Sequence, residues 1–253
     1  MSIYKVSAIS FYNTLPFVYG LNNNSIINEI ELSVDSPAEC ANKLMAGTVD
    51  IGLVPIVEIS KISHSQIFSN YCIGTNGSAR TVILASNVQL NEIREIVLDY
   101  QSRTSVILAQ ILAKKFWHID VSYKMGYSGF ENTEIKGNTA AVVIGNKVFP
   151  LEKKFKYVYD LSDEWKKYTT LPFVFACWVT NRSLDPEFVK KFEKAIKYGI
   201  GHIREASLTA KLNDFTNHKS IEDYLRNNMN FVLDDRKKEA MQLFLSLAQE
   251  IKL

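Results

Sequence analysis

The sequence has few of the residues that build disulfides and metal sites. It contains three cysteines, Cys40, Cys72 and Cys177, which are isolated, odd in number and lack C-x-x-C spacing. Its four histidines form no H-E-x-x-H pattern or other ligand spacing. We therefore expect no disulfide framework and no metal site, and a reducing cytoplasm suits this composition.

Long apolar runs and an excess of one charge are also missing. The N-terminal stretch MSIYKVSAIS is too short and too polar for a secretory signal, and no later run approaches the ~20 apolar residues of a membrane span. The net charge of +2 gives no field that would attract nucleic acid or an anionic membrane. The short basic clusters Lys153-Lys154 and Arg236-Lys237-Lys238 are expected to be solvated surface. The sequence does not indicate an oligomeric state.

Several catalytic and nucleotide-binding motifs are absent as well. No serine stands in a G-x-S-x-G elbow, no Walker loop occurs, and no G-x-G-x-x-G follows an expected strand. The sequence therefore offers no familiar nucleophile and no dinucleotide or P-loop site.

What is present is an alternation of apolar strands with helical patterns, which indicates an α/β architecture. Strands are expected at 4–9, 30–34 and 49–54, with helices at 15–21 and from 37 to about 46. Ser36-Pro37-Ala38-Glu39 predicts the second helix strongly, because Ser36 can cap it, Pro37 suits its first turn and Glu39 completes a capping box. This β-α-β-α-β order is typical of a parallel sheet with right-handed crossovers.

The pattern repeats further along the chain. Strands are expected at 81–85, 95–99, 121–123, 139–144 and 173–180, and a helix at 106–116. From Asp185-Pro186-Glu187 the chain is expected to be helical almost to its end. We predict a discontinuous first domain of 1–85 plus 180–253 and an inserted domain of 86–179, with a ligand cleft between them.

Four segments carry polar side chains near the ends of expected strands. They are Asn13-Thr14, the turn of 76–80 with Ser78 and Arg80, the helix entry of Ser102, Arg103, Thr104 and Ser105, and Gly145-Asn146. The helix entry is physically the clearest, because free backbone N–H groups, hydroxyls and an arginine together suit a carboxylate or phosphate. Arg103 could instead point outward, and one hydroxyl must serve as an N-cap.

Two of the other segments have ordinary interpretations. Asn13 could be only a helix cap, and the residues around Gly77 could form a plain glycine turn. Phe173 could belong to the core or could line a ligand pocket. The pentad Thr-Leu-Pro-Phe-Val occurs at 14–18 and again at 170–174, and we expect both copies to face the same cleft, although five residues are too few for an internal repeat.

Six motifs in order give the sequence a resemblance to a known family. They are SFYNTLPFVYGL (10–21), AGTVDIGLVPIVE (46–58), NGSARTVIL (76–84), LDYQSRTSVILAQIL (98–112), AAVVIGNK (140–147) and YDLSDEWKKYTTLPFVFACWV (159–179). Together they resemble the chorismate dehydratases of the futalosine route to menaquinone. The resemblance implies a type II periplasmic-binding-protein-like fold and dehydration of chorismate to 3-[(1-carboxyvinyl)oxy]benzoate, with no metal or organic cofactor.

The resemblance also implies roles for particular residues. The family's functional asparagine falls on Asn13 and its functional serine on Ser78, which makes these two the expected catalytic residues. The expected substrate-binding residues are Thr14, Arg80, Ser102, Arg103, Thr104, Ser105, Gly145, Asn146 and Phe173. In the mechanism proposed for the family, the enolpyruvyl carboxylate of the substrate removes the ring proton. The chain departs from the family by having Phe11-Tyr12 where Tyr-Leu is common, which places a change beside the site.

Two other functions remain open at this point. The 1,4-dihydroxy-6-naphthoate synthases of the same route share the fold, but they begin with an S-P-C-P-N-D-T-F-like motif and use a histidine. A solute-binding protein for an aromatic acid would need an export signal, which is not visible in the sequence.

Overall fold

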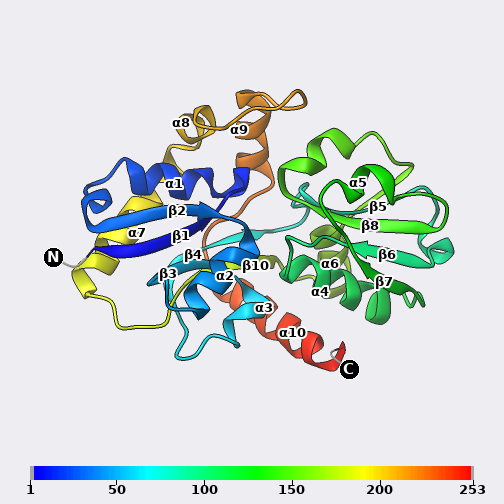
Figure 1. The fold of residues 1–253 in the computed structure, drawn as a ribbon, viewed down its shortest axis with the longest axis horizontal. Helices are drawn as coiled ribbons and strands as arrows, with labels where there is room; N and C mark the ends of the chain where they lie inside the picture. Colours follow the sequence, from blue (N-terminus) through cyan, green and yellow to red (C-terminus); the bar gives the residue numbers. More distant parts are fainter. Residues whose placement is uncertain (1–2, 252–253) are drawn as a thin grey trace. The chain divides into compact units, whose positions relative to one another are not determined.

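The computed structural model describes residues 3–251, which divide into two compact units (Figure 1). The first unit holds residues 3–74 and 174–234, and the second holds 75–173 and 235–251. This division differs from the predicted domains of 1–85 plus 180–253 and 86–179. The strand at 82–86 pairs within the second sheet, the strand at 173–180 pairs within the first, and the helix that starts at Asp235 packs in the second unit.

The first unit is built on a mixed sheet with the strand order β2-β1-β3-β10-β4. Its strands are β1 (Tyr4–Ile9), β2 (Ile30–Asp35), β3 (Ile51–Pro55), β4 (Gln66–Thr75) and β10 (Phe173–Thr180). β1 lies between β2 and β3 and is parallel to both, whereas β10 is antiparallel to β3. The predicted parallel β-α-β-α-β unit is confirmed, and β4 is a strand that the sequence did not reveal.

Two helices of the first unit begin at capping residues that the sequence predicts. The helices of this unit are α1 (Leu15–Asn22), α2 (Pro37–Met45), α3 (Ile56–Ile59), α7 (Pro186–Gly201), α8 (Ile203–Leu208) and α9 (His218–Asn227), with short 3-10 turns at η1 (Tyr12–Thr14) and η2 (Ser25–Glu29). The predicted capping box of α2 is present, since Ser36 accepts from the backbone of Glu39 and the Glu39 side chain accepts from the backbone of Ser36. Asp185 caps α7 by accepting from the backbone N–H of Glu187, and Pro186 occupies the first turn.

Two glycines let α1 and α7 approach each other closely. A Cβ at Gly20 would stand 2.0 Å from the carbonyl oxygen of Ala195, and one at Gly199 would stand 1.8 Å from that of Pro16. Neither position can carry a side chain without separating the two helices. This contact fixes α1, and with it the turn that precedes α1 and carries Asn13.

The second unit has its own mixed sheet, in the order β7-β6-β8-β5-β9. Its strands are β5 (Val82–Ser86), β6 (Glu95–Leu98), β7 (Ser122–Met125), β8 (Thr139–Ile144) and β9 (Tyr157–Asp160). β6 is parallel to β7 and β8, while β5 is antiparallel to both β8 and β9. Its α-helices are α4 (Thr104–Ile111), α5 (Phe130–Thr133), α6 (Leu161–Thr169) and α10 (Asp235–Ile251). It also has 3-10 segments at η3 (Leu90–Glu92) and η5 (Gly145–Leu151) and a π-helical turn at η4 (Leu112–Phe116).

An aromatic cluster joins distant parts of the second unit. Trp165, Phe173 and Phe244 pack edge to face, with ring centroids 5.2–6.2 Å apart, and each is at most 1% exposed. The second Thr-Leu-Pro-Phe-Val copy therefore supplies core: Phe173 lies in this cluster, and the carbonyl of Pro172 accepts a hydrogen bond from the Trp165 indole. This placement does not support the predicted role of Phe173 as a wall of a ligand pocket.

One expected surface residue is also buried. Lys237 is 1% exposed, whereas the basic cluster that contains it was expected to be solvated throughout. Its position explains the difference, because it begins the buried stripe of α10 that continues through Ala240, Met241, Phe244 and Ala248 at helical spacing.

The structure also tests the expectations about disulfides and membrane-spanning helices. Cys40, Cys72 and Cys177 are free thiols and all are buried. Burial raises the pKa of the Cys40 thiol to about 12, so this thiol is unreactive near neutral pH. Among residues 3–251, no helix combines the length and apolarity needed to cross a bilayer.

Candidate functional site

The turn after β1 presents an asparagine that does not cap a helix. β1 ends at Ile9, η1 follows, and α1 begins at Leu15 with Pro16 in its first turn. Neither η1 nor α1 has a side-chain cap, so the interpretation of Asn13 as a plain N-cap is wrong. The residue is half-buried.

The amide of Asn13 is oriented by its neighbour. Thr14, which is 1% exposed, donates its hydroxyl proton to Asn13 Oδ1 at 3.2 Å. Within the described part of the chain, Asn13 Nδ2 donates no hydrogen bond to a protein atom. Two N–H groups can thus be offered to an acceptor such as a carboxylate or hydroxyl oxygen of a ligand.

In the second unit, four polar segments meet at one edge of the sheet. β6 and β8 are parallel, so Asp99 and Gly145, which follow them, lie at the same edge. β5 runs the other way and begins beside the end of β8, with Val82 opposite Ile144. β9 ends there too, with Asp160 opposite Ile83. The register therefore gathers the predicted segments 76–80, 102–105 and 145–146 in one place.

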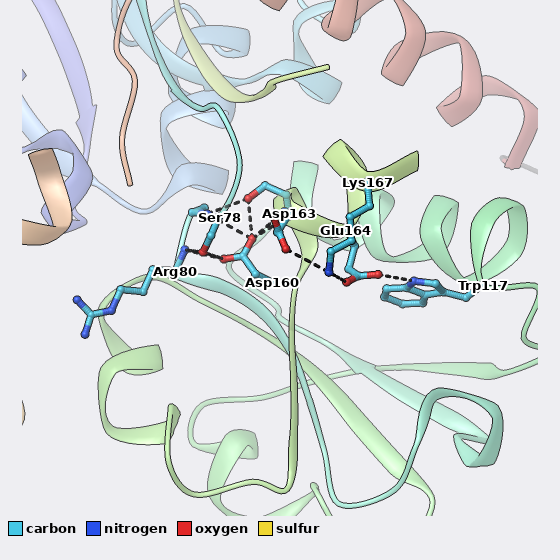
Figure 2. A network of polar contacts seen from close by, with 9 residues as sticks. Ser78, Arg80, Trp117, Asp160, Asp163, Glu164 and Lys167 are labelled. Carbon is cyan, nitrogen blue, oxygen red and sulfur yellow. Dashed lines mark hydrogen bonds and ion pairs between the residues drawn. The ribbon is translucent and has the colours of Figure 1, made fainter. Parts of the chain in front are cut away.

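Ser78 is held at this edge by a carboxylate that sequence reasoning missed. Its hydroxyl donates to Asp160 Oδ2 at 2.8 Å, and the Ser78 side chain is otherwise exposed (Figure 2). Asp160 lies 82 residues later, at the point where β9 becomes α6. Its place before Leu161-Ser162-Asp163 is typical of a helix N-cap, which points to no contact with Ser78.

The two oxygens of Asp160 receive different donors. Oδ1 accepts from the backbone of Ser162 and Asp163 at 3.1 and 3.0 Å and so caps α6. Oδ2 accepts from the Ser78 hydroxyl and, at 2.6 Å, from the backbone N–H of Arg80. The carboxylate therefore joins the start of a helix to the loop that carries Ser78.

Beyond Asp160, α6 is fastened by a second set of charges. Lys167 pairs with Glu164 at 2.7 Å and with Asp163 at 3.2 Å, and the indole of Trp117 donates to Glu164 at 3.1 Å (Figure 2). The two ion pairs lie within α6, and the Trp117 hydrogen bond joins the helix to the segment after η4.

Arg80 has a partner of its own. Its guanidinium forms two hydrogen bonds to Glu152, at 2.5 and 3.0 Å, and lies 4.9 Å from the ring centroid of Phe149. Its backbone has a φ of 61°, a left-handed conformation that is uncommon outside glycine. Because the charge is paired with Glu152, this geometry does not favour the predicted direct contact of Arg80 with an anion.

The helix entry at 102–105 is compact and largely buried. Ser102, Thr104 and Ser105 are 3–4% exposed, while Arg103 is half-buried. Ser102 Oγ accepts from the backbone of Ser105 at 3.2 Å, so it is the hydroxyl that satisfies a free amide at the start of α4. The other two hydroxyls and the Arg103 side chain remain the predicted contacts of this segment.

A buried ion pair ties this helix entry to the segment after β8. Asp99 is fully buried and pairs with Lys147 at 2.7 Å, and it also accepts from the backbone of Gln101 and Ile144. The Lys147 ammonium lies 5.3 Å from the ring centroid of Tyr100. Burial raises the pKa of the Asp99 carboxyl, and the nearby Lys147 charge opposes that rise without cancelling it.

Backbone hydrogen bonds complete the assembly of this edge. Gly145, whose φ is 72°, donates its N–H to the carbonyl of Thr81 at 2.8 Å, which joins the segment after β8 to the end of the Ser78 loop. Ser78, the helix entry of α4 and Gly145-Asn146 thus form one surface of the second unit. Asn13 and Thr14 belong to the first unit. No group of three or more potential metal ligands occurs among residues 3–251.

Comparison with known proteins shows the family to which the chain belongs. Residues 4–250 match the sequence model of a family described as "Menaquinone biosynthesis". A chorismate dehydratase of Thermus thermophilus is 26% identical over 191 residues, which cover 68% of this chain and 69% of that protein.

Solved structures agree on the fold. A crystal structure of an Archaeoglobus fulgidus protein superposes with a TM-score of 0.73 at 14% identity, covering 98% of this chain and 97% of the other. A Candida albicans protein described as having the generic periplasmic binding protein fold gives a TM-score of 0.66 at 15% identity, covering 100% and 92%. At such low identity these structures speak for the fold alone, and the predicted periplasmic-binding-protein-like class is confirmed.

Proposed function

We propose that this chain, which belongs to the menaquinone biosynthesis family, dehydrates chorismate to 3-[(1-carboxyvinyl)oxy]benzoate. The observation that carries the proposal is the gathering of Ser78, the α4 entry and Gly145-Asn146 at one edge of the second sheet. These are three of the segments that resemble the chorismate dehydratases. The distant relative of that name supports the same activity.

The reaction is an elimination of water. One ring C–H bond and the neighbouring C–O bond break, and the electron pair left on carbon becomes the third double bond of a benzene ring. The ring hydroxyl leaves as water once it has gained a proton. Because the product is aromatic, the overall step is strongly favourable and only its barrier must be lowered.

Substrate positioning is the main contribution that we assign to the protein. In our proposal the substrate's enolpyruvyl carboxylate takes the ring proton, which requires that side chain to be held over the ring. Asn13 Nδ2 would hydrogen-bond a substrate oxygen and Ser78 would hold a second polar group. The hydroxyls of Thr104 and Ser105, Arg103 and the backbone around Asn146 would bind a carboxylate at the positive end of α4.

The direct test is to mix purified protein with chorismate and follow the products by mass spectrometry and ultraviolet absorbance. Loss of one water with formation of a benzoate chromophore is the expected result. Binding without turnover would replace the proposal with an aromatic-acid receptor. If chorismate is inert but a later intermediate of the route reacts, the chain is a 1,4-dihydroxy-6-naphthoate synthase instead.

Two earlier expectations stay predictions within this proposal. One is that Asn13 and Ser78, which belong to different units, contact the same substrate molecule. The other is a cytoplasmic location, for which the cysteine content is the sequence argument.

A further inference from the structure

We infer that Asp160 is a positioning residue that fixes the Ser78 hydroxyl in the geometry needed for catalysis, both directly and by holding the backbone of Arg80. The inference rests on the proposed function, because it assumes that Ser78 contacts the substrate. Its starting point is the hydrogen bond of 2.8 Å from Ser78 Oγ to Asp160 Oδ2 (Figure 2).

Capping alone does not account for the contacts of this carboxylate. An N-cap needs one side-chain oxygen that accepts from the first turn of its helix. Asp185 is such a case in the first unit, where Oδ1 accepts from the backbone of Glu187. Asp160 performs the same task with Oδ1, which leaves Oδ2 for residues outside the helix.

Both donors that reach Oδ2 belong to the loop that carries Ser78. One is the Ser78 hydroxyl, and the other is the backbone N–H of Arg80 at 2.6 Å. The backbone N–H of Ala79, between them, lies 3.3 Å from Oδ1 and 2.9 Å from the hydroxyl of Ser162, a neighbour of Asp160 in α6. Three consecutive residues of the loop are therefore held by the first turn of one helix.

The conformation of the loop explains why such an acceptor is needed. Arg80 has a φ of 61°, which costs a non-glycine residue of order 1 kcal/mol or more and persists only when its surroundings impose it. The short hydrogen bond from its N–H to an ionised carboxylate is a strong constraint of this kind. The ion pair of the Arg80 side chain with Glu152 holds the same residue from the other side.

The chemical consequence concerns the orientation of Ser78. An exposed serine hydroxyl rotates among three staggered positions, and only some of them present it usefully to a substrate. Donation to Asp160 selects one position before the substrate arrives, so the cost of ordering the side chain is not added to the reaction barrier. Asp160 thus acts through Ser78 and does not itself need to contact the reacting atoms.

Two substitutions separate this role from capping. Asp160→Asn and Asp160→Ser both keep an oxygen that can cap α6, because Asn and Ser are good N-cap residues. Asn places an NH2 group where Oδ2 faces the Arg80 N–H, and Ser removes that atom altogether. Asp185→Asn is the matched control, since it makes the same change at a helix cap that does not touch the loop.

The experiment is a double-mutant cycle on chorismate turnover, with thermal unfolding recorded for every variant. We expect each Asp160 variant to lose roughly a hundredfold in kcat, with a smaller change in KM, while Asp185→Asn keeps wild-type kinetics. In a Ser78→Ala background the same Asp160 changes should lower kcat by a further factor of less than about three. The reason is that the Ser78 hydroxyl, through which Asp160 acts, is gone.

The outcomes are distinct for the two proposals. Equal losses from the Asp160 changes with and without Ser78 would overturn the positioning role, and so would wild-type kinetics in both Asp160 variants. If one variant fails to fold, the other carries the cycle. A wild-type protein that leaves chorismate unchanged would instead overturn the proposed function, and the positioning role would fall with it.

Discussion

The two expected catalytic side chains are supported in very different ways. Ser78 is held by a carboxylate 82 residues away, and that carboxylate also orders the following two residues of the loop. Among the described residues, the Asn13 side chain has one hydrogen bond, which the adjacent Thr14 donates at 3.2 Å. The serine is thus positioned by tertiary structure and the asparagine by its own turn, which is anchored through α1 and α7.

This difference predicts where function is sensitive to change. Around Ser78, residues that never touch a ligand should matter almost as much as the serine. Around Asn13, sensitivity should be concentrated in the asparagine itself. Kinetic measurements on variants at the two sites test this contrast directly.

The largest effect is expected from Asn13→Ala. Removing one well-placed hydrogen-bond donor from a transition state costs on the order of 3 kcal/mol, roughly a hundredfold in kcat. Steady-state kinetics with chorismate would measure it. The control is Asn23→Ala at the end of α1, whose amide bonds only the backbone of Tyr19 and which should leave the rate unchanged. Wild-type turnover by the Asn13 variant would remove the asparagine from the mechanism.

The next effect concerns stability of the second unit. Asp99→Ala leaves Lys147 without its carboxylate and two backbone N–H groups without their acceptor. We expect a loss of about 2 kcal/mol, below the usual range for a broken buried pair because Lys147 is 21% exposed and can reach water. Urea unfolding followed by fluorescence would test this. Asp163→Ala is a control at an exposed pair and should change little.

A smaller effect is expected in the pH dependence of stability. Because the folded-state pKa of Asp99 is raised, its protonated form favours the folded state, and that stability is lost as pH rises from about 4 through the raised value. The stability of the wild type relative to Asp99→Asn should therefore fall as pH rises through this window and then level off. Unfolding curves from about pH 4 to 8 would show it. A difference that grows with pH would mean that Lys147 dominates and that the pKa is lowered.

The smallest effect is expected from Thr14→Val, which keeps the buried volume and removes the hydrogen bond to Asn13. The adjacent backbone still fixes the asparagine, so kcat should fall only about threefold, near the net value of one neutral hydrogen bond. A loss as large as that of Asp160→Asn would show that the two side chains are supported alike, contrary to the comparison.

How far the sequence could predict the fold depended on whether the signals were local. Ser36, Pro37 and Glu39 specify the start of α2 within four residues, and Asp185-Pro186 do the same for α7, so both helices were predicted correctly. β4 was missed because Gln66–Thr75 mixes polar and apolar residues without a clear alternation. β9 was missed because Tyr157–Asp160 is short and follows a run of lysines.

The same distinction between local and distant signals explains which site residues could be predicted from the sequence. Ser78 and the 102–105 segment could be singled out because their residue types are meaningful within a few positions. Asp160 and Lys147 could not be singled out, because their partners lie far away in the chain. Asp160 contacts Ser78, and Lys147 pairs with Asp99. For Phe173 the sequence left core and pocket wall both open, and the packing of its ring against Phe244 of α10 favours the core.

The path of α10 has a consequence for biosynthesis. Residues 75–173 leave the ribosome well before Phe244 is made, so the aromatic cluster of Trp165, Phe173 and Phe244 stays incomplete while residues 174–234 are being added. A nascent chain at that stage would expose two large rings that attract chaperones or neighbouring chains. Folding of the second unit is therefore expected to wait until Phe244 has left the ribosome, with docking of α10 as its closing step.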